Sequence, residues 1–271
     1  MQDQAARTVH ISIVSHGHGE DVARLLDDLQ QQSGGAKLSV ILTLNREEHL
    51  AFDKTGFAFP LLIHRNDCTQ GFAENNNQAF RLAAPAPGDY FCLINPDVRI
   101  QHDVFGPLID CLEQQKKAGV VAPLICNSYG DIEDSARRLP TPLSILGKAV
   151  GIREKPLDIK HGRCQPVDWV AGMFMLFPTG AYAAVGGFDE RYFLYYEDVD
   201  LCCRLRLAGY EVFLAPTVVA VHDGRRDSRR RPAYFLQHLR SMGRFFLSRS
   251  YLGCRFRLRA DAEKKGPGRP A

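Results

Sequence analysis

The first half of the chain alternates short apolar segments with segments of helical spacing, and this alternation limits the fold most strongly. We predict strands at residues 9–15, 37–44, 61–64, 90–94 and 119–123, and helices at 20–32, 72–83 and 104–117. Strands that alternate with helices favour a mostly parallel sheet with helices on both faces. In such α/β sheets, ligands bind at the carboxyl ends of the strands. The first half is therefore predicted to bind a nucleotide.

The second half is less regular. Residues 127–165 read as a long irregular segment rich in turn formers. After it we predict an apolar strand at 169–178, helices at 180–185 and 197–208, strands at 211–214 and 217–221, and an amphipathic helix at 234–248. Long loops in compact domains are usually functional or mobile. We expect one α/β domain over residues 1–222 and a basic, helical C-terminal extension and tail over residues 223–271.

Composition supports a folded chain with an uneven charge. Of 271 residues, 45% are hydrophobic and 24% are charged, which suffices for one substantial core and argues against disorder. The net charge is only +3, but arginines crowd the C-terminal end. They are Arg225, Arg226, Arg229, Arg230, Arg231, Arg240, Arg244, Arg249, Arg255, Arg257 and Arg259. A basic C-terminal segment of this kind is suited to bind anionic lipid, a nucleotide or nucleic acid. Alternatively, the arginines simply form a solvated helix face.

The cysteines and the N-terminus point to a reducing compartment. None of the 8 cysteines forms a C-x-x-C pair, and several lie in apolar runs where cysteine acts as a small hydrophobe. The sequence has no basic segment followed by a long apolar one near its start, and no apolar run long enough to cross a bilayer. We therefore expect a cytoplasmic protein.

One candidate site follows the strand at 90–94. Asn95-Pro96-Asp97 places a carboxylate at the end of a buried strand. There Asp97 is suited to hold a divalent cation, Mg²⁺ or Mn²⁺, that bridges two phosphates. The same three residues also make a good turn. His222, at the end of the strand 217–221, is either a further metal ligand or a residue that merely ends a strand.

A second candidate is the acidic group Glu197, Asp198 and Asp200 at a helix start. Acids at this position complement the helix dipole. The aromatic and apolar residues 193–196, just before the helix, also favour a position for some of these acids beside a site that excludes water. There a carboxylate acts as a general base on a hydroxyl.

A third candidate is the segment from Asn66 to Asn77. Gly71 permits a close backbone approach and opens a helix with free N–H groups, while Asn76 or Asn77 is suited to bind a base or ribose. An ordinary helix cap explains the same residues. Gly17 and Gly19 suggest a dinucleotide fingerprint, but Val22 stands where its third glycine belongs, so we reject that interpretation.

In this order the motifs resemble those of the family 2 inverting glycosyltransferases of the GT-A fold, especially the bacterial rhamnosyltransferase-like branch. The resemblance runs from about Val9 to His222, with the segment 238–242 in addition, and is most specific from Trp169 to Tyr210. It implies a GT-A fold and a metal-dependent hexosyltransferase.

The resemblance also implies roles for single residues. Asn95 and Asp97 take the place of the D-x-D motif, with Asp97 binding the metal. Asp198 resembles the general base of a Glu-Asp pair, with Glu197 beside it, and His222 resembles a late histidine that joins the metal.

Further positions are implied on the donor and acceptor sides. Ser15, Asn66, Gly71, Asn76 and Asn77 lie where members of the family approach the nucleotide. Asp168 and Trp169 match a segment that lines the acceptor side.

Two departures from the family pattern concern the nucleotide. Asn95 replaces the first acid of D-x-D, and Asn45 stands where many members carry an aspartate that recognises the base. Both changes leave the identity of the nucleotide open.

The predicted function is transfer of rhamnose from dTDP-rhamnose to a hydroxyl of a glycan or lipid-linked acceptor in cell-envelope polysaccharide synthesis. A basic C-terminal helix on the anionic inner face of the membrane suits such an acceptor. Three alternatives are weighed beside it. They are an inactive nucleotide-sugar-binding protein, a nucleic-acid binder, and a nucleotidyltransferase, which would need a basic triphosphate loop where residues 16–19 have none.

Overall fold

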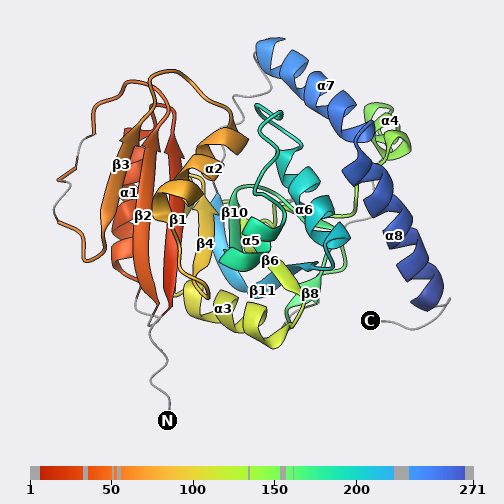
Figure 1. The fold of residues 1–271 in the computed structure, drawn as a ribbon, viewed down its shortest axis with the longest axis horizontal. Coiled ribbons are helices and arrows are strands. Elements are labelled where there is room, and N and C mark those ends of the chain that lie inside the picture. Colours follow the sequence, from red (N-terminus) through yellow and green to blue (C-terminus); the bar gives the residue numbers. More distant parts are fainter. Residues whose placement is uncertain are drawn as a thin grey trace.

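The fold was analysed in a computed structural model that describes the chain except residues 1–6, 33–35, 51, 54–55, 134, 153–156, 161, 223–231 and 266–271. A large sheet forms its centre, with strand order β3-β2-β1-β4-β10-β6-β11-β5, and β8 pairs with β11 (Figure 1). Its strands are β1 (Thr8–Ser15), β2 (Lys37–Leu44), β3 (Leu61–Arg65), β4 (Tyr90–Ile94), β5 (Val98–Arg99), β6 (Ala118–Cys126), β8 (Gln165–Pro166), β10 (Phe174–Pro178) and β11 (Glu211–His222). A second, small sheet pairs β7 (Ala136–Arg137) with β9 (Trp169–Val170).

The central sheet is mixed. Strands β1 to β4 run parallel to one another, and β11 is parallel to β6. β10 is inserted between β4 and β6 and runs antiparallel to both. The start of β10 therefore lies at the carboxyl ends of its neighbours, where β4 leads into Asn95 and β11 ends at His222.

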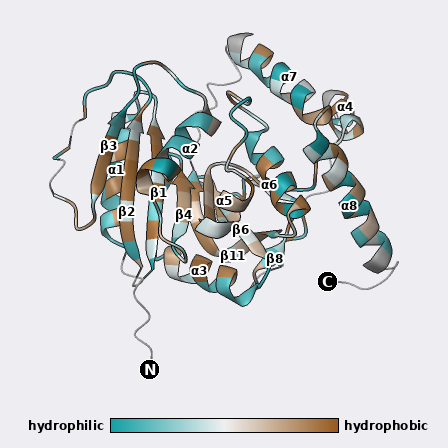
Figure 2. Cartoon of the chain, viewed as in Figure 1, coloured by the Kyte–Doolittle hydropathy of each residue, from teal (hydrophilic) through white to brown (hydrophobic). Residues whose placement is uncertain are grey.

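Helices cover both faces of the sheet. They are α1 (Gly19–Gln30), α2 (Phe72–Ala83), α3 (Phe105–Gln114), α4 (Pro142–Ala149), α5 (Thr179–Ala184), α6 (Glu197–Leu207), α7 (Pro232–Phe246) and α8 (Arg249–Lys265). One apolar cluster joins α1 and α3 to one face, and a second joins α2, α5 and α6 to the other. Figure 2 shows hydrophobic colour concentrated on the strands between these layers. The α/β class predicted from the alternation is confirmed.

Most strands and helices lie within a few residues of their predicted positions, with three corrections in the second half. The predicted strand at 169–178 is two strands, because residues 171–173 turn between β9 and β10. The strands predicted at 211–214 and 217–221 are one, β11, with a bulge between Ala215 and Val219. The segment 127–165, predicted to be irregular, contains β7 and the capped helix α4.

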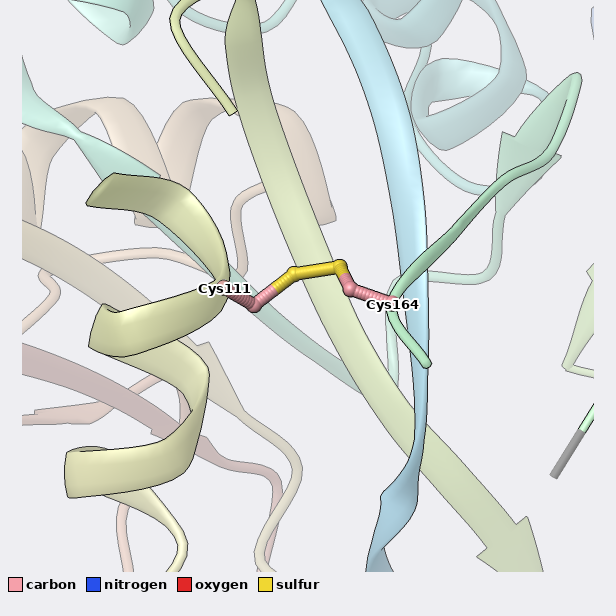
Figure 3. Close-up of a disulfide and its surroundings, with 2 residues drawn as sticks. All are labelled: Cys111 and Cys164. Atoms are coloured by element: carbon pink, nitrogen blue, oxygen red, sulfur yellow. A yellow bond between two sulfur atoms is a disulfide. The ribbon is translucent and has the colours of Figure 1, made fainter. Parts of the chain in front are cut away.

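Two cysteines, for which we predicted no pairing, are bonded to each other. Cys111 of α3 and Cys164, just before β8, form a disulfide with their Cα atoms 6.0 Å apart (Figure 3). That separation lies in the usual range for disulfides. The pair links a helix on one face of the sheet to the irregular segment beside β11. Spacing along the sequence gave no sign of it.

The C-terminal helices pack on the rest of the protein. α8 lies against α6 (Figure 1), and its Tyr251 and Cys254 are buried there. Ser250 at its start donates a hydrogen bond to the buried carboxylate of Asp200 in α6. The arginine run at 225–231 lies outside the described residues. The division at residue 222 stays a prediction.

Arg204 joins α6 to the turn after α5 and also pairs with a buried carboxylate of its own helix. Arg204 donates to the Asp200 carboxylate at 2.7 Å and to the backbone carbonyls of Val185 and Gly187 at 2.7 and 2.6 Å. The Asp200 side chain is only 3% exposed. Loss of Arg204 would leave a buried carboxylate and two carbonyls without these donors.

We predict that Arg204→Ala lowers the free energy of unfolding by about 3–5 kcal/mol, as expected when one partner of a buried pair is removed. Arg24→Ala is the matched control, because Arg24 pairs with Asp21 on an exposed helix face and should cost less than about 1 kcal/mol. Urea denaturation of both variants measures the difference. Equal losses would contradict the structural role given to Arg204.

Candidate active site

Asp97 and His222 meet at the carboxyl ends of the strands. β5 follows Asp97 directly and pairs antiparallel with the end of β11, with His222 opposite Val98. The His222 Nε2 atom lies 3.3 Å from Oδ2 of Asp97, and the two side chains are 13% and 32% exposed. Two residues that are 125 positions apart in the sequence thus share one partly exposed position.

Each group changes the protonation of the other. Burial acts to raise the pKa of Asp97, but the hydrogen bond and charge of His222 outweigh it, so the pKa of Asp97 is lowered. Burial acts to lower the pKa of His222, but Asp97 and Glu133 together raise it to about 9. Without a cation, His222 is therefore protonated at neutral pH.

The pair fits a divalent cation. Two ligands about 2.1 Å from an octahedral Mg²⁺ or Mn²⁺ and at right angles lie about 3 Å apart, close to the Asp97–His222 separation. The described residues contain no group of three or more His, Cys, Asp or Glu side chains placed to hold a metal. Two protein ligands suit an ion that keeps water and takes phosphate oxygens.

Asp198 is held by backbone N–H groups. Its Oδ2 accepts from Gly172 at 3.1 Å and its Oδ1 from Val199 at 2.8 Å. Burial raises the pKa of Asp198, and these two hydrogen bonds only partly oppose the shift. A fixed carboxylate of raised pKa is suited to accept a proton from a hydroxyl.

Glu197 has a different environment from its neighbour. Only 5% of the residue is exposed, and its buried Oε2 has no hydrogen-bond partner. Burial and the charge of Asp198 raise the pKa of Glu197 well above its usual range. Of the two acids, Asp198 is therefore the better placed to meet a substrate.

One short segment contacts both halves of the site. The carbonyl of Met173 accepts from the N–H of Asn95 at 2.9 Å, and the N–H of Gly172 donates to Asp198. Asp97 is two residues beyond Asn95. Residues 172–173 are therefore bonded both to the segment that leads into Asp97 and to Asp198.

The residues before Asp198 adopt an uncommon conformation. Tyr195 and Tyr196 have φ of 70° and 68°, which is strained for residues with a side chain. Helix α7 supports them, since the His238 ring contacts Tyr195 edge-on and Tyr196 at a tilt, and Ser241 donates to the carbonyl of Leu194 at 2.7 Å. The C-terminal extension thus helps to place the candidate base.

Asn45 is buried in a closed hydrogen-bond network. Its Nδ2 donates to the Gln70 carbonyl and the His16 ring, both at 2.8 Å. Its Oδ1 accepts from Asn66 Nδ2 and the Gln70 N–H, at 2.7 and 2.8 Å. A carboxamide has two donors and two acceptor lone pairs. All four are used inside the protein.

The asparagines of α2 also bond within the protein. Asn76 accepts from Ser12 and donates to the Phe72 carbonyl. Asn77 bonds to the OH of Tyr182 and to both backbone groups of Phe188. These contacts fasten α2 to β1 and to the segment before α6.

Ser15 and Gly71 shape the backbone. The buried Ser15 hydroxyl accepts from the N–H of His18, which holds the turn after β1. A Cβ on Gly71 would lie 2.8 Å from the backbone of Phe193. The close approach predicted for Gly71 is thus made by this chain's own residues 193–196.

Asp168 and Trp169 organise the other side of the site. Asp168 Oδ2 accepts from the Leu139 N–H at 2.8 Å, and Trp169 Nε1 donates to the Arg138 carbonyl at 3.0 Å. The Arg137 guanidinium lies over the indole, 5.3 Å from the ring centroid. Its charge also acts to lower the pKa of Asp198. Arg137 therefore packs on Trp169, and its charge is felt at the candidate base.

Comparison with known proteins now identifies the family. No protein-family model matches the chain. It is 31% identical to the rhamnosyltransferase WbbL of Escherichia coli K12 over 258 residues, which cover 91% of this chain and 96% of WbbL. The chain belongs to the rhamnosyltransferase-like family 2 glycosyltransferases.

Other relatives of this glycosyltransferase agree. A Mycobacterium tuberculosis N-acetylglucosaminyl-diphospho-decaprenol L-rhamnosyltransferase is 31% identical over 60% of this chain and 56% of its own length. Haloferax volcanii Agl10, a hexosyltransferase of low-salt glycan biosynthesis, is 25% identical over 66% of this chain and 57% of its own length. These relatives are enzymes that transfer sugars, and this chain is a glycosyltransferase.

Solved structures support the GT-A fold of this glycosyltransferase. GalNAc-T7, solved with UDP, GalNAc and Mn²⁺, has a TM-score of 0.61 at 14% identity and covers 81% of this chain and 44% of its own. The mannosyltransferase PcManGT of Pyrobaculum calidifontis, solved with GDP-Man and Mn²⁺, has a TM-score of 0.54 at 15% identity. The match covers 97% of this chain and 76% of PcManGT. The predicted fold is confirmed.

The sequence did not indicate every residue that contacts the candidate site of this glycosyltransferase. Glu133, whose Oε2 lies 3.0 Å from His222 Nδ1, falls in the segment predicted to be irregular. The turn formers Asn127 and Gly130 after β6 were the only signal that the chain folds back there. The supporting role of His238 and Ser241 had no signal in the spacing of residues.

Proposed function

We propose that this glycosyltransferase transfers rhamnose from dTDP-rhamnose to a hydroxyl of a lipid-linked glycan in cell-envelope polysaccharide synthesis, with inversion at the anomeric carbon. The observation that carries the proposal is that one turn, residues 172–173, bonds both to Asn95, two residues before Asp97, and to the Asp198 carboxylate. The rhamnosyltransferase names of two relatives support the sugar, and the diphospho-decaprenol in one name supports a lipid-linked acceptor.

The proposed mechanism is a single displacement. Asp97 and His222 would hold a Mg²⁺ or Mn²⁺, which when bound supplies charge that stabilises the departing nucleoside diphosphate. The acceptor oxygen bonds to the anomeric carbon as the bond from that carbon to the diphosphate breaks. Asp198 takes the proton of the acceptor hydroxyl. Glu197, buried and of raised pKa, stays outside the proton transfer.

The remaining candidate residues are assigned by their contacts. We propose that Asn95, whose backbone bonds to Met173, faces the donor. Asp168 and Trp169 form the acceptor side through the strand pair β7–β9, where Arg137 is suited to contact phosphate.

We propose that one wall of the donor site is already formed before the nucleotide binds. Ser15, Asn45, Asn66, Asn76 and Asn77 would support the nucleotide by fixing the backbone around Gln70 and Gly71, since their side chains bond mainly within the protein. Because Gly71 has no side chain, the backbone of this wall packs directly against residues 193–196.

We predict that Asp198→Asn lowers transfer by at least about 100-fold while donor binding stays within a few-fold of wild type, because an amide cannot accept the proton. Asp97→Asn should weaken metal-dependent donor binding as well. Radiolabelled sugar transfer and calorimetric titration with the donor measure the two effects. Substantial turnover by Asp198→Asn would remove Asp198 from the role of base.

We predict that dTDP-rhamnose raises the melting temperature more than UDP-, GDP- or other dTDP-sugars, and only with Mn²⁺ or Mg²⁺ present. Mass action makes the best ligand give the largest shift. A panel with EDTA as the metal-free control measures it. A larger metal-dependent shift with another nucleotide would replace dTDP in the proposal.

We also propose that α7 and α4 rest on an anionic membrane at the cytoplasmic side. α7 exposes apolar side chains beside Arg240 and Arg244, and α4 with the residues just after it exposes others beside Lys148. The apolar set is Tyr234, Phe235, Leu236, Leu239, Leu143, Leu146, Val150 and Ile152. Apolar and basic groups together favour an anionic lipid surface. Within the described ranges, no helix has the length and apolar character to span a membrane.

We predict that the full chain sediments with vesicles of anionic phospholipid, and less at high salt, because basic side chains contribute to the attraction. The double change Phe235→Glu with Leu239→Glu should reduce binding at least about 10-fold. Leu82→Glu, an exposed leucine of α2, is the control and should bind like wild type. Equal binding by all three proteins, or none by wild type, would refute this contact.

A further inference from the structure

The His222 ring lies between two carboxylates. Nε2 faces Asp97, while Nδ1 lies 3.0 Å from Oε2 of Glu133 on the other edge of the ring. The Glu133 side chain is 26% exposed. Neither the motifs nor the resemblance to known glycosyltransferases assigned a role to Glu133.

The backbone places Glu133 firmly at this position. After β6 the chain turns back, and the Asn127 side chain accepts from the N–H groups of Tyr129 and Asp131 at 3.0 and 2.9 Å. Ile132 then forms a bridge with Cys126, and the Glu133 N–H donates to the Ile125 carbonyl at 2.8 Å. Because β6 is the neighbour of β11, this turn brings Glu133 beside the end of β11.

Each ring nitrogen of His222 faces a carboxylate, and when a cation takes the place of one ring proton, the hydrogen bond to Glu133 decides which nitrogen keeps the other. A carboxylate only accepts, so the proton of this bond belongs to Nδ1 of His222. A neutral imidazole with its proton on Nδ1 has its lone pair on Nε2. That nitrogen is the one directed to Asp97. Histidines that bind metals commonly donate their other N–H to a carboxylate in this way.

We propose that Glu133 is a positioning residue that holds His222 in the Nδ1–H tautomer, with Nε2 directed at the cation shared with Asp97. The inference rests on the metal site of the proposed function. Glu133 acts from the far edge of the imidazole, since its Oε2 faces Nδ1 while Nε2 faces Asp97. It fixes the ring orientation and makes Nε2 a better electron donor.

The first test measures metal affinity rather than activity. Mn²⁺ binding to the full chain is followed by electron paramagnetic resonance, with dTDP, UDP and GDP in parallel. Glu133→Ala should weaken Mn²⁺ binding about 10- to 100-fold, the usual effect of removing such a partner. Glu133→Gln, whose amide oxygen still accepts from Nδ1, should recover most of the affinity.

Asp131→Asn is the matched control, since Asp131 lies on the same turn and its side chain accepts from Asn127. It should bind Mn²⁺ like wild type. Wild-type affinity in a folded Glu133→Ala would overturn the proposal, and so would equal losses in Glu133→Ala and Asp131→Asn. Asp97→Ala distinguishes failure of this inference from failure of the proposed metal site. If Asp97→Ala also binds Mn²⁺ like wild type, the metal site of the proposed function is wrong as well.

The second test needs no variant at Glu133. Nitrogen-15 resonances of the histidine rings, with His222→Gln to assign the His222 signals, are recorded in the wild-type chain with Mg²⁺ and the nucleotide that binds best. A protonated Nδ1 and an unprotonated Nε2 support the proposal. A proton on Nε2 in the metal-bound state overturns it.

Discussion

The insertion of β10 between β4 and β6 is the constraint on which the candidate site depends. β10 runs against its two neighbours, so the chain enters it at the edge where they end. At that entrance the carbonyl of Met173 holds Asn95 and the N–H of Gly172 holds Asp198. One tight turn after β9 therefore bonds both to the segment that leads into Asp97 and to Asp198, the two carboxylates that we propose as metal ligand and base.

The sequence predicted the alternating half of the fold well because local patterns determine it. β2, α2 and β4 have the predicted bounds, since each is a continuous apolar or periodic run ended by turn residues. The second half depended on tertiary pairing. β9 and β10 form one apolar run in the sequence, and only their different partners, β7 in one sheet and β4 in the other, divide them. The disulfide between Cys111 and Cys164 also depends on tertiary structure, which brings together two cysteines with a sequence separation of 53.

The site was predictable as a set of residues but less so as a set of roles. Asp97, His222 and Asp198 follow from strand ends and a helix start, and the structure brings the first two into contact. Spacing cannot reveal whether a polar side chain faces a ligand or the protein. Asn76 and Asn77 stand one turn into α2, where substrate and backbone are equally plausible partners from the sequence, and both bond to the protein. The support of Tyr195 by α7 was equally hidden, since it joins segments about forty residues apart.

The closed amide network around Asn45 limits which side chains can stand at that position. Each amide there fixes the orientation of the next, from His16 through Asn45 to Asn66 and Asn75. An aspartate in place of Asn45 would lose two donors at once and face the Gln70 carbonyl with a charge. A carboxylate at position 45 would therefore not fit unless the neighbouring amides exchanged their donor and acceptor groups together.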